Sequence, residues 1–501
     1  MQMIGRTGIG LTIVAALAWS PARAAEVDPG LVAQAQSLGS APVLIVLPDQ
    51  SAPPLMPLRA DADPVARRSA LVATLRVRAS ADQAPLRAWL DRRGVAHRDY
   101  WIVNVIAARL NAAQIRQVAA RGDVARVATD QATRVRPLPQ EASASETQAV
   151  QALPWGLVTI NAPEAWAHGV RGQGAVVAGE DTGYQWDHPA LKAQYRGWSG
   201  SSADHDYNWH DAIHTDQHGS SCGVDSPFPC DDQGHGTHTM GTMIGDDGGS
   251  NQIGVAPAAR WIGCRNMDAG WGTPARYIEC MQWMLAPTDL AGNNPNPALA
   301  PDVINNSWAC VKKEGCTTGE EIRTAVDNVI AGGIFFAAAA GNEGSSCASI
   351  INSPGTYAES FAVAATDSND ALAGFSSRGP SPGATAGNVF LDLAAPGVSV
   401  RSSIPTDTYG YMSGTSMATP HVAGTVALMV SVNPALRGHP DQIAGILRAS
   451  AVRQGITDSY NSSCGGLTLA DWPNYQAGYG RLDAWAAVRM ADTLFADGLE
   501  P

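Results

Sequence analysis

Three short segments contain the residue types needed for nucleophilic attack on a carbonyl group. Residues 176–183 (VVAGEDTG) are an apolar run ending in an acid, residues 234–238 (GHGTH) place a histidine at an expected helix start, and residues 413–421 (SGTSMATPH) lead from a turn into a long apolar helix. A serine hydroxyl becomes a strong nucleophile when an imidazole takes its proton and a carboxylate fixes that imidazole. Asp181, His235 and Ser416 therefore predict acyl-transfer chemistry.

Each segment taken alone has an ordinary structural interpretation. Asp-Thr-Gly is commonly a turn, a histidine before a helix is commonly a cap or a surface residue, and Gly-Thr-Ser is commonly a helix entry. Their joint occurrence in one chain, in this order and with these flanks, favours the catalytic interpretation over three unrelated coincidences.

The same motifs resemble those of the subtilase family. DTG, GHGTH and GTSMATPHVAG follow one another in the order Asp, His, Ser, and the resemblance covers about residues 155 to 490, including GYGRLDA at 478–484. The segments GHGTHTMGTMIGDDG, NQIGVAP, PDVINNSW and FSSRGP are similar to the bacillopeptidase F-like branch. The resemblance implies a secreted serine endopeptidase that hydrolyses peptide bonds in proteins through an acyl-enzyme, with Asp181 as orienting acid, His235 as base and Ser416 as nucleophile.

A fourth residue follows from residues 339–344 (AAGNEG). The tetrahedral intermediate of acyl transfer carries negative charge on the former carbonyl oxygen, and a fixed amide donor lowers that barrier. Asn342 matches the oxyanion asparagine of the family, and the backbone N–H of Ser416 is the expected second donor. Without the other motifs, the same stretch would be interpreted as a surface turn.

Two segments resemble the strands that sandwich an extended peptide substrate: Gly270-Trp271-Gly272 and Ser307-Trp308-Ala309. Main-chain pairing of this kind holds many sequences, while side-chain pockets select among them. The two tryptophans either wall apolar subsites or serve ordinary packing. Glu343 and Asn352 are expected at the edge of the first specificity pocket, where Glu343 would favour a basic or polar side chain.

The chain departs from the family pattern at several positions. Glu180 stands where an apolar or amide residue is usual, and strand alternation predicts that it points away from His235. The stretch 195–232 is long and mixes four histidines with aspartates, which indicates a solvated insertion more than a metal site: His205, His210, His214 and His218. Ala190 occupies the position of a family calcium ligand. No cofactor is expected to be required, the metal ligands stay unknown, and Asp246 and Asp247 leave room for calcium as a structural ion.

Other functions would require different residues. A sedolisin-type carboxyl peptidase also uses a Gly-Thr-Ser turn, but it needs a glutamate base where this chain has His235. A catalytically silent subtilase fold that only binds peptides predicts a lost catalytic residue, and all four are present. A lipase-type hydrolase is disfavoured because Ser416 lacks a glycine two residues later.

The elements around these residues predict an α/β fold. Strand-like runs at 174–178, 255–264, 303–306, 334–340 and 360–365 alternate with helical segments at 238–244, 274–285, 320–331 and 419–432. Such alternation is typical of a mostly parallel sheet covered by helices. The resemblance makes this a three-layer subtilisin-like fold with seven strands, spanning residues 151–501.

The N-terminal third reads as a targeting segment and a separate small domain. A basic start, an apolar run from Ile9 to Trp19 and Ala22-Arg23-Ala24 predict a signal peptide at residues 1–24. Residues 25–150 resemble the α+β propeptide of subtilases, with a strand at 43–47, helical spacing over 65–93, a strand at 100–110, a helix capped by Asn111 and a strand at 124–128. Residues 137–149 (PLPQEASASETQA) read as a linker.

Charge and cysteine usage fit an exported precursor. Residues 25–150 carry a net charge of +3 and residues 151–501 a net charge of −18, so the two parts could dock. The overall charge of −13 argues against nucleic acid as a partner. Eight cysteines allow up to four disulfides, and the short-range pairs Cys222–Cys230 and Cys310–Cys316 are favoured. The expected partners are protein or peptide substrates and the chain's own propeptide. The expected location is extracellular or periplasmic, with no membrane association after signal removal.

Overall fold

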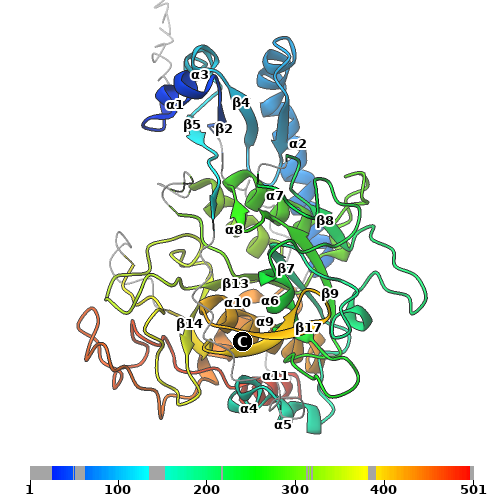
Figure 1. Ribbon diagram of the computed structural model, residues 1–501, viewed down its shortest axis with the longest axis vertical. Helices are drawn as coiled ribbons and strands as arrows, with labels where there is room; N and C mark the ends of the chain where they lie inside the picture. Colours follow the sequence, from blue (N-terminus) through cyan, green and yellow to red (C-terminus); the bar gives the residue numbers. More distant parts are fainter. Residues whose placement is uncertain are drawn as a thin grey trace, which may run out of the picture.

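The computed structural model of the protein describes residues 25–48, 50, 63–134, 153–215, 218–311, 314, 316, 320–381 and 391–496 (Figure 1). The expected signal peptide at residues 1–24 and the expected linker at 137–149 lie outside the described residues. The N-terminal residues form a small unit that stands on a larger one. In the described ranges, no helix is both long enough and apolar enough to cross a bilayer.

The larger unit is built on a seven-stranded sheet with the order β15-β14-β13-β12-β7-β9-β8, and every strand pair in it is parallel. Strands such as β13 (FFAAA) are apolar throughout because helices bury both faces of the sheet. The expected mostly parallel seven-stranded sheet is thereby confirmed. In chain order the strands are β7 (Val176–Asp181), β8 (Trp209–Asp211), β9 (Arg260–Arg265), β12 (Val303–Asn306), β13 (Phe335–Ala339), β14 (Phe361–Thr366) and β15 (Leu393–Pro396).

Helices cover the two faces of this sheet. On one face, Val177 shares a core with helices α6 (His235–Ile244), α9 (Thr415–Val432) and α11 (Ala484–Ala496). On the other face, Ala178 shares a core with α7 (Pro274–Leu285) and α8 (Glu320–Ala331). Adjacent strand residues thus point into opposite cores, as pleated alternation requires. The unit also contains α4 (Trp155–Thr159), α5 (Ala162–Ala167), η1 (Lys192–Gln194), η2 (Pro297–Leu299), η4 (Pro434–Leu436), α10 (Pro440–Ala449) and the hairpin of β16 (Val400–Ile404) and β17 (Thr408–Met412).

The described part of the small unit has a five-stranded sheet with the order β1-β5-β2-β4-β3 and three helices. The expected helix after Asn111 is present, because the Asn111 side chain and Gln114 form a reciprocal capping box. The elements are β1 (Glu26–Val27), α1 (Leu31–Leu38), β2 (Ala41–Val46), α2 (Pro64–Asp91), β3 (His97–Tyr100), β4 (Val105–Leu110), α3 (Ala112–Ala119) and β5 (Arg126–Thr129).

The single strand expected over residues 100–110 is wrong. The chain breaks at 101–104, between β3 and β4. The reason is a contact with the larger unit: the backbone N–H groups of Trp101 and Ile102 both donate to the Gln282 Oε1 atom on α7, at 2.6 and 3.1 Å. A long-range hydrogen bond has replaced the local ladder that the apolar pattern predicts.

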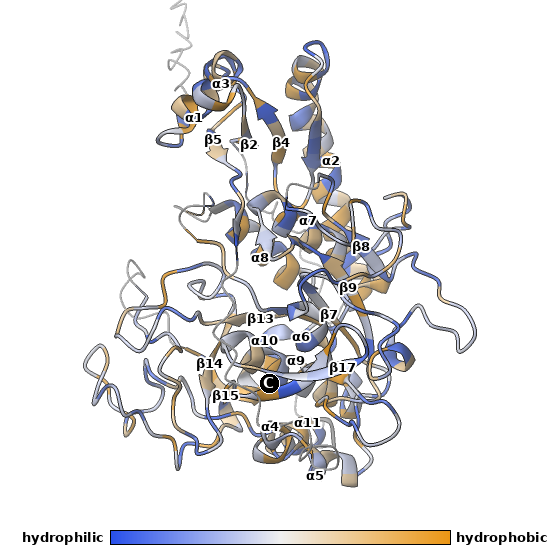
Figure 2. Cartoon of the chain, viewed as in Figure 1, coloured by the Kyte–Doolittle hydropathy of each residue, from blue (hydrophilic) through white to orange (hydrophobic). Residues whose placement is uncertain are grey.

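The small unit packs against α7 and α8. Leu44, Leu75 and Ile102 share one hydrophobic core with residues of both helices. Asp130 Oδ1 accepts a hydrogen bond from Ala275 N at 2.8 Å and so caps the N-terminus of α7. Hydrophilic segments are visible along α2, whose sequence is rich in arginine (Figure 2).

All eight cysteines form disulfides within the larger unit. The two expected short-range pairs, Cys222–Cys230 and Cys310–Cys316, are confirmed. The other pairs are Cys264–Cys280, which ties β9 to α7, and Cys347–Cys464, with a sequence separation of 117 residues.

Candidate active site

The candidate acid and base lie on adjacent elements. Asp181 is the last residue of β7 and His235 is the first residue of α6. The His235 Nδ1 atom is 2.8 and 2.9 Å from the two carboxylate oxygens of Asp181, and both residues are buried. The backbone N–H of Thr182 donates to Asp181 Oδ1 at 2.7 Å and helps to fix the carboxylate. The arrangement holds the imidazole with its Nε2 atom turned away from the acid.

The environment of His235 favours its charged form. Burial by itself lowers the pKa of the imidazole, but the charge and hydrogen bond of Asp181, together with the charge of Asp231, raise it above 6.5. Burial instead lowers the pKa of neighbouring His238 to about 3, and the His238 Nε2 atom bonds the carbonyl of Val400 at 2.9 Å. Of the two histidines in GHGTH, only His235 has a carboxylate partner.

Sequence reasoning missed the role of Asp231, which organises the loop before α6. Its Oδ1 accepts hydrogen bonds from Thr182 Oγ1 at 2.9 Å and from the backbone N–H of Gly234 at 2.7 Å. Its Oδ2 accepts from the backbone and side chain of Thr237 at 3.0 and 2.6 Å. Asp231 thus ties the segment after Asp181 to the first turn of α6, a contact that the sequence signals only as an acid four residues before His235.

Ser416 is the second residue of α9 and lies at the start of that helix. Its Oγ atom donates to the carbonyl oxygen of Ser307 at 3.0 Å, while Ser307 Oγ donates back to the Ser416 carbonyl at 2.8 Å. Among the described residues, no hydrogen bond joins Ser416 Oγ to His235. The hydroxyl rests on Ser307, the residue directly after β12.

Asn342 follows β13 and is oriented by Thr415. Its side-chain oxygen accepts hydrogen bonds from Thr415 N at 2.9 Å and from Thr415 Oγ1 at 3.0 Å. With the oxygen held in this way, the NH₂ group is the end of the amide that can donate to a ligand. The preceding Gly341 has φ of 107°, a left-handed conformation that favours glycine. Sequence reasoning found Asn342 but gave Thr415 no role.

The two expected cleft segments differ in what they expose. Gly270 precedes strand β11 (Trp271–Gly272), which pairs with β10 (Met267–Asp268). The Trp271 ring is partly exposed and stacks on His218, with centroids 4.6 Å apart.

In the second segment, Trp308 is only 1% exposed and stacks on Tyr277 at 4.0 Å. Burial places the Trp308 ring in packing and not at a subsite wall. The main chain of Ser307, Trp308 and Ala309 is what this segment can offer to a substrate.

The cleft edge is occupied by the chain itself. Residues Thr133–Arg134 form β6, which pairs antiparallel with β11, with Arg134 opposite Trp271 and Thr133 opposite Gly272. On the other side, the backbone N–H of Gln131 donates to the carbonyl of Glu314 at 3.3 Å. A Cβ atom built on Gly270 would lie 3.7 Å from Gln233, two residues before His235, and 3.8 Å from Arg134. The end of the small unit therefore adds an extended strand close to the candidate base.

At the edge of the expected first pocket, the Asn352 amide donates to Glu343 Oε1 at 2.8 Å. The two side chains that were expected at this pocket therefore contact each other, and both remain at least partly exposed.

Glu180 is fully buried, and alternation along β7 places it on the α7 side of the sheet. Neither of its carboxyl oxygens has a hydrogen-bond partner of normal geometry in the described part of the chain. Burial raises the pKa of Glu180 well above 4.5, and the charge of Asp181 adds to this effect while Asn266 opposes it. Burial therefore favours the protonated form of the side chain.

Each histidine of the long insertion has a side-chain hydrogen-bond partner, and two of them share one carboxylate. His205 bonds Tyr195, His218 bonds Asp268, and both His210 and His214 bond Glu279. Within the described ranges, no group of three or more His, Cys, Asp or Glu residues is placed to hold a metal ion. Asp247 lies in a turn whose N–H groups and Asn251 side chain bond its carboxylate, and Asp246 pairs with Arg171 at 3.4 Å.

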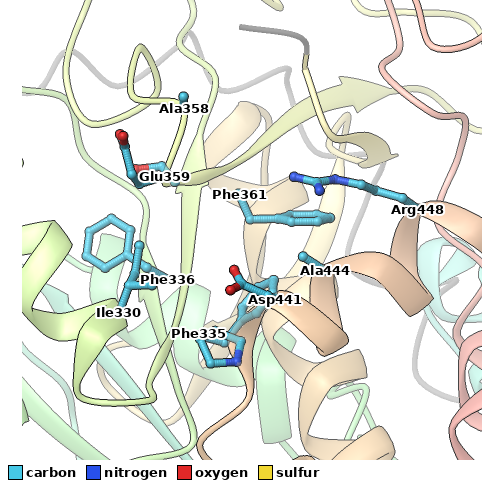
Figure 3. A pocket seen from close by; sticks show the side chains of 11 residues that line it. Ile330, Phe335, Phe336, Ala358, Glu359, Phe361, Asp441, Ala444 and Arg448 are labelled. Carbon is cyan, nitrogen blue, oxygen red and sulfur yellow. The ribbon is translucent and has the colours of Figure 1, made fainter. Parts of the chain in front are cut away.

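One cavity of about 440 Å³ lies away from these residues. Its walls include Phe335 and Phe361, at the amino ends of β13 and β14, whereas Asn342 follows the carboxyl end of β13 (Figure 3). Arg448 lines it and pairs with Asp392 at 2.6 Å. The cavity thus lies at the amino ends of the parallel strands, whereas the candidate acid, base and nucleophile lie at their carboxyl ends.

Comparison with known proteins identifies the family. The subtilase family model matches residues 172–476. The chain is 37% identical to bacillopeptidase F of Bacillus subtilis (strain 168) over 441 residues, which are 84% of this chain and 28% of that relative. It is 32% identical to subtilisin E of the same organism over 346 residues, 69% of this chain and 75% of the relative.

An alkaline protease of Shouchella clausii is 34% identical over 323 residues, which are 64% of this chain and 70% of that relative. The chain therefore spans little more than a quarter of bacillopeptidase F but most of the length of the shorter subtilases. The expected likeness to the bacillopeptidase F-like branch is confirmed by the longest of these matches. Because the family model covers more than half of the residues and the parallel sheet agrees with it, the chain belongs to the subtilase family of serine peptidases.

Proposed function

We propose that this chain is the precursor of a secreted subtilisin-like serine endopeptidase in which Asp181, His235 and Ser416 form the catalytic triad. The observation that carries the proposal is the hydrogen-bonded pair of His235 and Asp181 at the end of β7. Ser416 and Asn342 stand at the ends of the neighbouring elements α9 and β13, and Thr415 links them. Ends of parallel strands and starts of helices are where α/β sheets place their sites.

The chemistry begins with a rotation of the Ser416 hydroxyl. Its Oγ–H leaves the Ser307 carbonyl and turns toward His235 Nε2, which takes the proton as Oγ attacks the peptide carbonyl carbon. Asp181 holds the His235 Nδ1–H and stabilises the imidazolium that forms. His235 then gives the proton to the leaving amine. Water hydrolyses the resulting acyl-enzyme by the reverse sequence of proton transfers.

The oxyanion of the tetrahedral intermediate needs two donors. The Asn342 NH₂ group and the backbone N–H of Ser416 take this role, since Thr415 fixes the other end of the Asn342 amide. Gly270 to Gly272 and Ser307 to Ala309 supply the two main-chain edges for an extended substrate.

Residues 25–150 act as the propeptide in this proposal. Support comes from β6, which pairs with β11 where a substrate strand would lie and so excludes the substrate. Export through a signal peptide at residues 1–24 agrees with the four disulfides, which are typical of oxidising compartments.

The test is the Ser416→Ala variant. It should still fold, because Ser416 is replaced by a smaller residue in a helix. It should lose peptidase activity by about 10⁶-fold, the loss that removal of the serine nucleophile causes in subtilisin. Activity is measured on a fluorogenic peptide with purified protein from which the small unit has been removed, by an added protease for the variant that does not process itself.

Ser201→Ala, which changes an exposed serine in a loop, is the matched control and should keep full activity. If folded Ser416→Ala protein, free of host proteases, cleaved the peptide at the rate of the control, the catalytic assignment would be wrong.

A further inference from the structure

The first turn of α2 contacts the large unit outside the two candidate cleft segments, 270–272 and 307–309. Helix α2 is 28 residues long, and its N-terminal turn meets the large unit at η2 and at the end of α8. There the Arg68 side chain, 6% exposed, donates from Nε to the carbonyl of Gly332 at 2.7 Å and from Nη1 to the carbonyl of Pro297 at 3.0 Å. Arg67 donates to the carbonyl of Gly438 at 2.9 Å.

These acceptors are chemically suited to a cation. Gly332 directly follows the last residue of α8, so its carbonyl belongs to the negative end of that helix, where orphan carbonyls accept hydrogen bonds from basic side chains. Burial lowers the pKa of Arg68 to about 10 although the charge of Asp302 opposes this, so the guanidinium remains charged at neutral pH. Arg68 therefore caps the C-terminus of α8 from outside the large unit.

The backbone around this contact is shaped for close approach. Gly438 has φ of 79°, and a Cβ atom built on it would lie 2.7 Å from Pro64 Cγ and 3.1 Å from Arg67 Nη2. A side chain at Gly438 would thus collide with the first residue of α2. Gly333 faces Gly438 just as closely, since its Cβ would lie 2.7 Å from the Gly438 Cα atom.

The small unit thereby holds α8 at both ends. At the N-terminal end, Arg126 Nη1 lies 3.1 Å from Glu321 Oε1, and at the C-terminal end Arg68 holds Gly332. With 12 residues, α8 is about 18 Å long by the rise of an α-helix, so the two contacts are well separated. A ligand held at two distant points dissociates only when both contacts open, which slows its release.

We infer that Arg68, with Arg67, forms a second anchor that binds the propeptide to the carbonyls of Pro297, Gly332 and Gly438, and that this anchor retains the cleaved propeptide on the enzyme. The inference rests on the proposed function, since it assumes that residues 25–150 are cut off and inhibit. These carbonyls form a surface of the large unit that binds two arginines at the start of a helix, Arg67 and Arg68. Because the acceptors are neutral carbonyls and Arg68 is buried, the anchor depends only weakly on ionic strength.

The test compares full-length chains that process themselves. Wild type, Arg68→Ala, Arg68→Lys and the control Arg76→Ala are purified, and two quantities are followed after processing: the lag before peptidase activity appears, and the fraction of propeptide that co-elutes with the catalytic unit. Arg76 is an exposed arginine on the same helix, so its loss changes charge without removing the anchor.

Arg68→Ala should shorten the lag by about tenfold or more, because two hydrogen bonds from a charged, buried guanidinium are lost and two carbonyls are left without that donor. Arg68→Lys should fall between Arg68→Ala and wild type, since lysine keeps the charge but not the fork. Arg76→Ala should match wild type. The ratio between Arg68→Ala and wild type should change little between about 0.05 and 0.5 M salt.

The outcomes separate the two ideas. If wild type is fully active with no lag and no bound propeptide, the proposed inhibitory role fails. If wild type shows a lag that Arg68→Ala leaves unchanged, or that Arg76→Ala shortens equally, the anchor is overturned. Thermal unfolding of the same variants in a Ser416→Ala background identifies any variant whose small unit no longer folds; for such a variant, the lag of Arg68→Lys decides.

Discussion

The Ser416 hydroxyl donates to a main-chain carbonyl instead of to the imidazole. This contact places the proposed nucleophile beside Ser307, the residue that follows β12. In the proposed function the same serine also supplies a backbone N–H for the oxyanion, and the start of α9 sets the position of that group. Substitutions at the neighbouring residues Asn342 and Thr415 measure how much each side chain contributes to the rate.

Asn342→Ala should lower kcat by about 10²–10³-fold with little change in KM, because it removes one oxyanion donor and leaves the triad intact. Thr415→Val should lower kcat less, since Asn342 keeps its bond to the Thr415 backbone N–H while losing the one to Oγ1. Steady-state kinetics on one peptide give both values. A Thr415→Val loss as large as that of Asn342→Ala would mean that Thr415 does more than orient the amide.

The pH dependence of activity should follow His235. Since Asp181 and Asp231 raise the pKa of His235 above 6.5, the base becomes protonated and inactive as pH falls through a value above 6.5. Activity is therefore lost on the acid side and kept on the alkaline side of that value.

Burial lowers the pKa of His238 to about 3 and that of His421 to about 4, so neither titrates in this range. The profile of kcat/KM against pH is the measurement. A maximum near pH 4 would instead favour the carboxyl-peptidase alternative.

Glu180 should make the fold less stable as pH rises. Its pKa in the folded chain is raised, so above its unfolded value of about 4.5 the unfolded chain releases a proton that the folded chain keeps. Glu180→Gln removes this penalty. The gain in the free energy of unfolding should be small at pH 4 and should grow as pH rises above 4.5, by at most about 1.4 kcal/mol per pH unit.

Urea unfolding at pH 4, 5.5 and 7 in a Ser416→Ala background checks this, with exposed Glu164→Gln as the control. A gain that does not change with pH would show that Glu180 is ionised in the folded chain.

Among the elements, helices α7 and α8 begin and end where the sequence predicts, at 274–285 and 320–331. Their apolar spacing is regular, and Thr273 caps α7 through a hydrogen bond from Arg276 N. The proposed triad and Asn342 could also be predicted from sequence, because each of these residues stands within a short motif. Local pattern was sufficient wherever local contacts decide the structure.

The remaining elements depend on partners distant in sequence. β8 has three residues inside a polar insertion and is a strand only because β9 pairs with it. β6 has two residues and is a strand only because β11, which also pairs with β10, lies beside it. The hydrogen bond from the Thr415 backbone N–H to the Asn342 side-chain oxygen joins residues 73 positions apart, and no sequence pattern predicts it.

The disulfide Cys347–Cys464 should matter most for the elements that it joins. It closes a loop of 117 residues and ties the segment after Asn342 to the C-terminal loops, whereas Cys310–Cys316 spans a sequence separation of only 6. The entropy that a cross-link removes from the unfolded chain grows with loop length. Replacing both cysteines of the long-range pair by alanine should cost about 2–5 kcal/mol of stability, and more than the same change at the short-range pair.

Thermal unfolding of the two double variants, again with Ser416→Ala, gives the comparison. Equal losses would show that local strain or contacts, and not loop closure, set the contribution of each bond. Reduction of the unmodified protein should lower its melting temperature as well.

For the whole molecule, the mature enzyme should start between about Pro137 and Pro154. The composition and charge change across this stretch, and the described chain resumes with α4, where Trp155 Nε1 donates to the Val398 carbonyl at 3.2 Å inside the large unit. N-terminal sequencing of secreted protein is the measurement. A start near Ala25 would show that the small unit is retained.

No covalent bond other than the main chain joins the two units, because all four disulfides lie within residues 222–464. If residues 25–150 are the proposed propeptide, a single cut changes them from a tethered segment, with an effective concentration in the millimolar range, into a free ligand at the concentration of the enzyme itself. Cleavage alone then leaves the enzyme inhibited wherever its concentration is high, and dilution releases the propeptide and activates the enzyme. Such an enzyme would become active only after it has diffused away from the cell that secretes it.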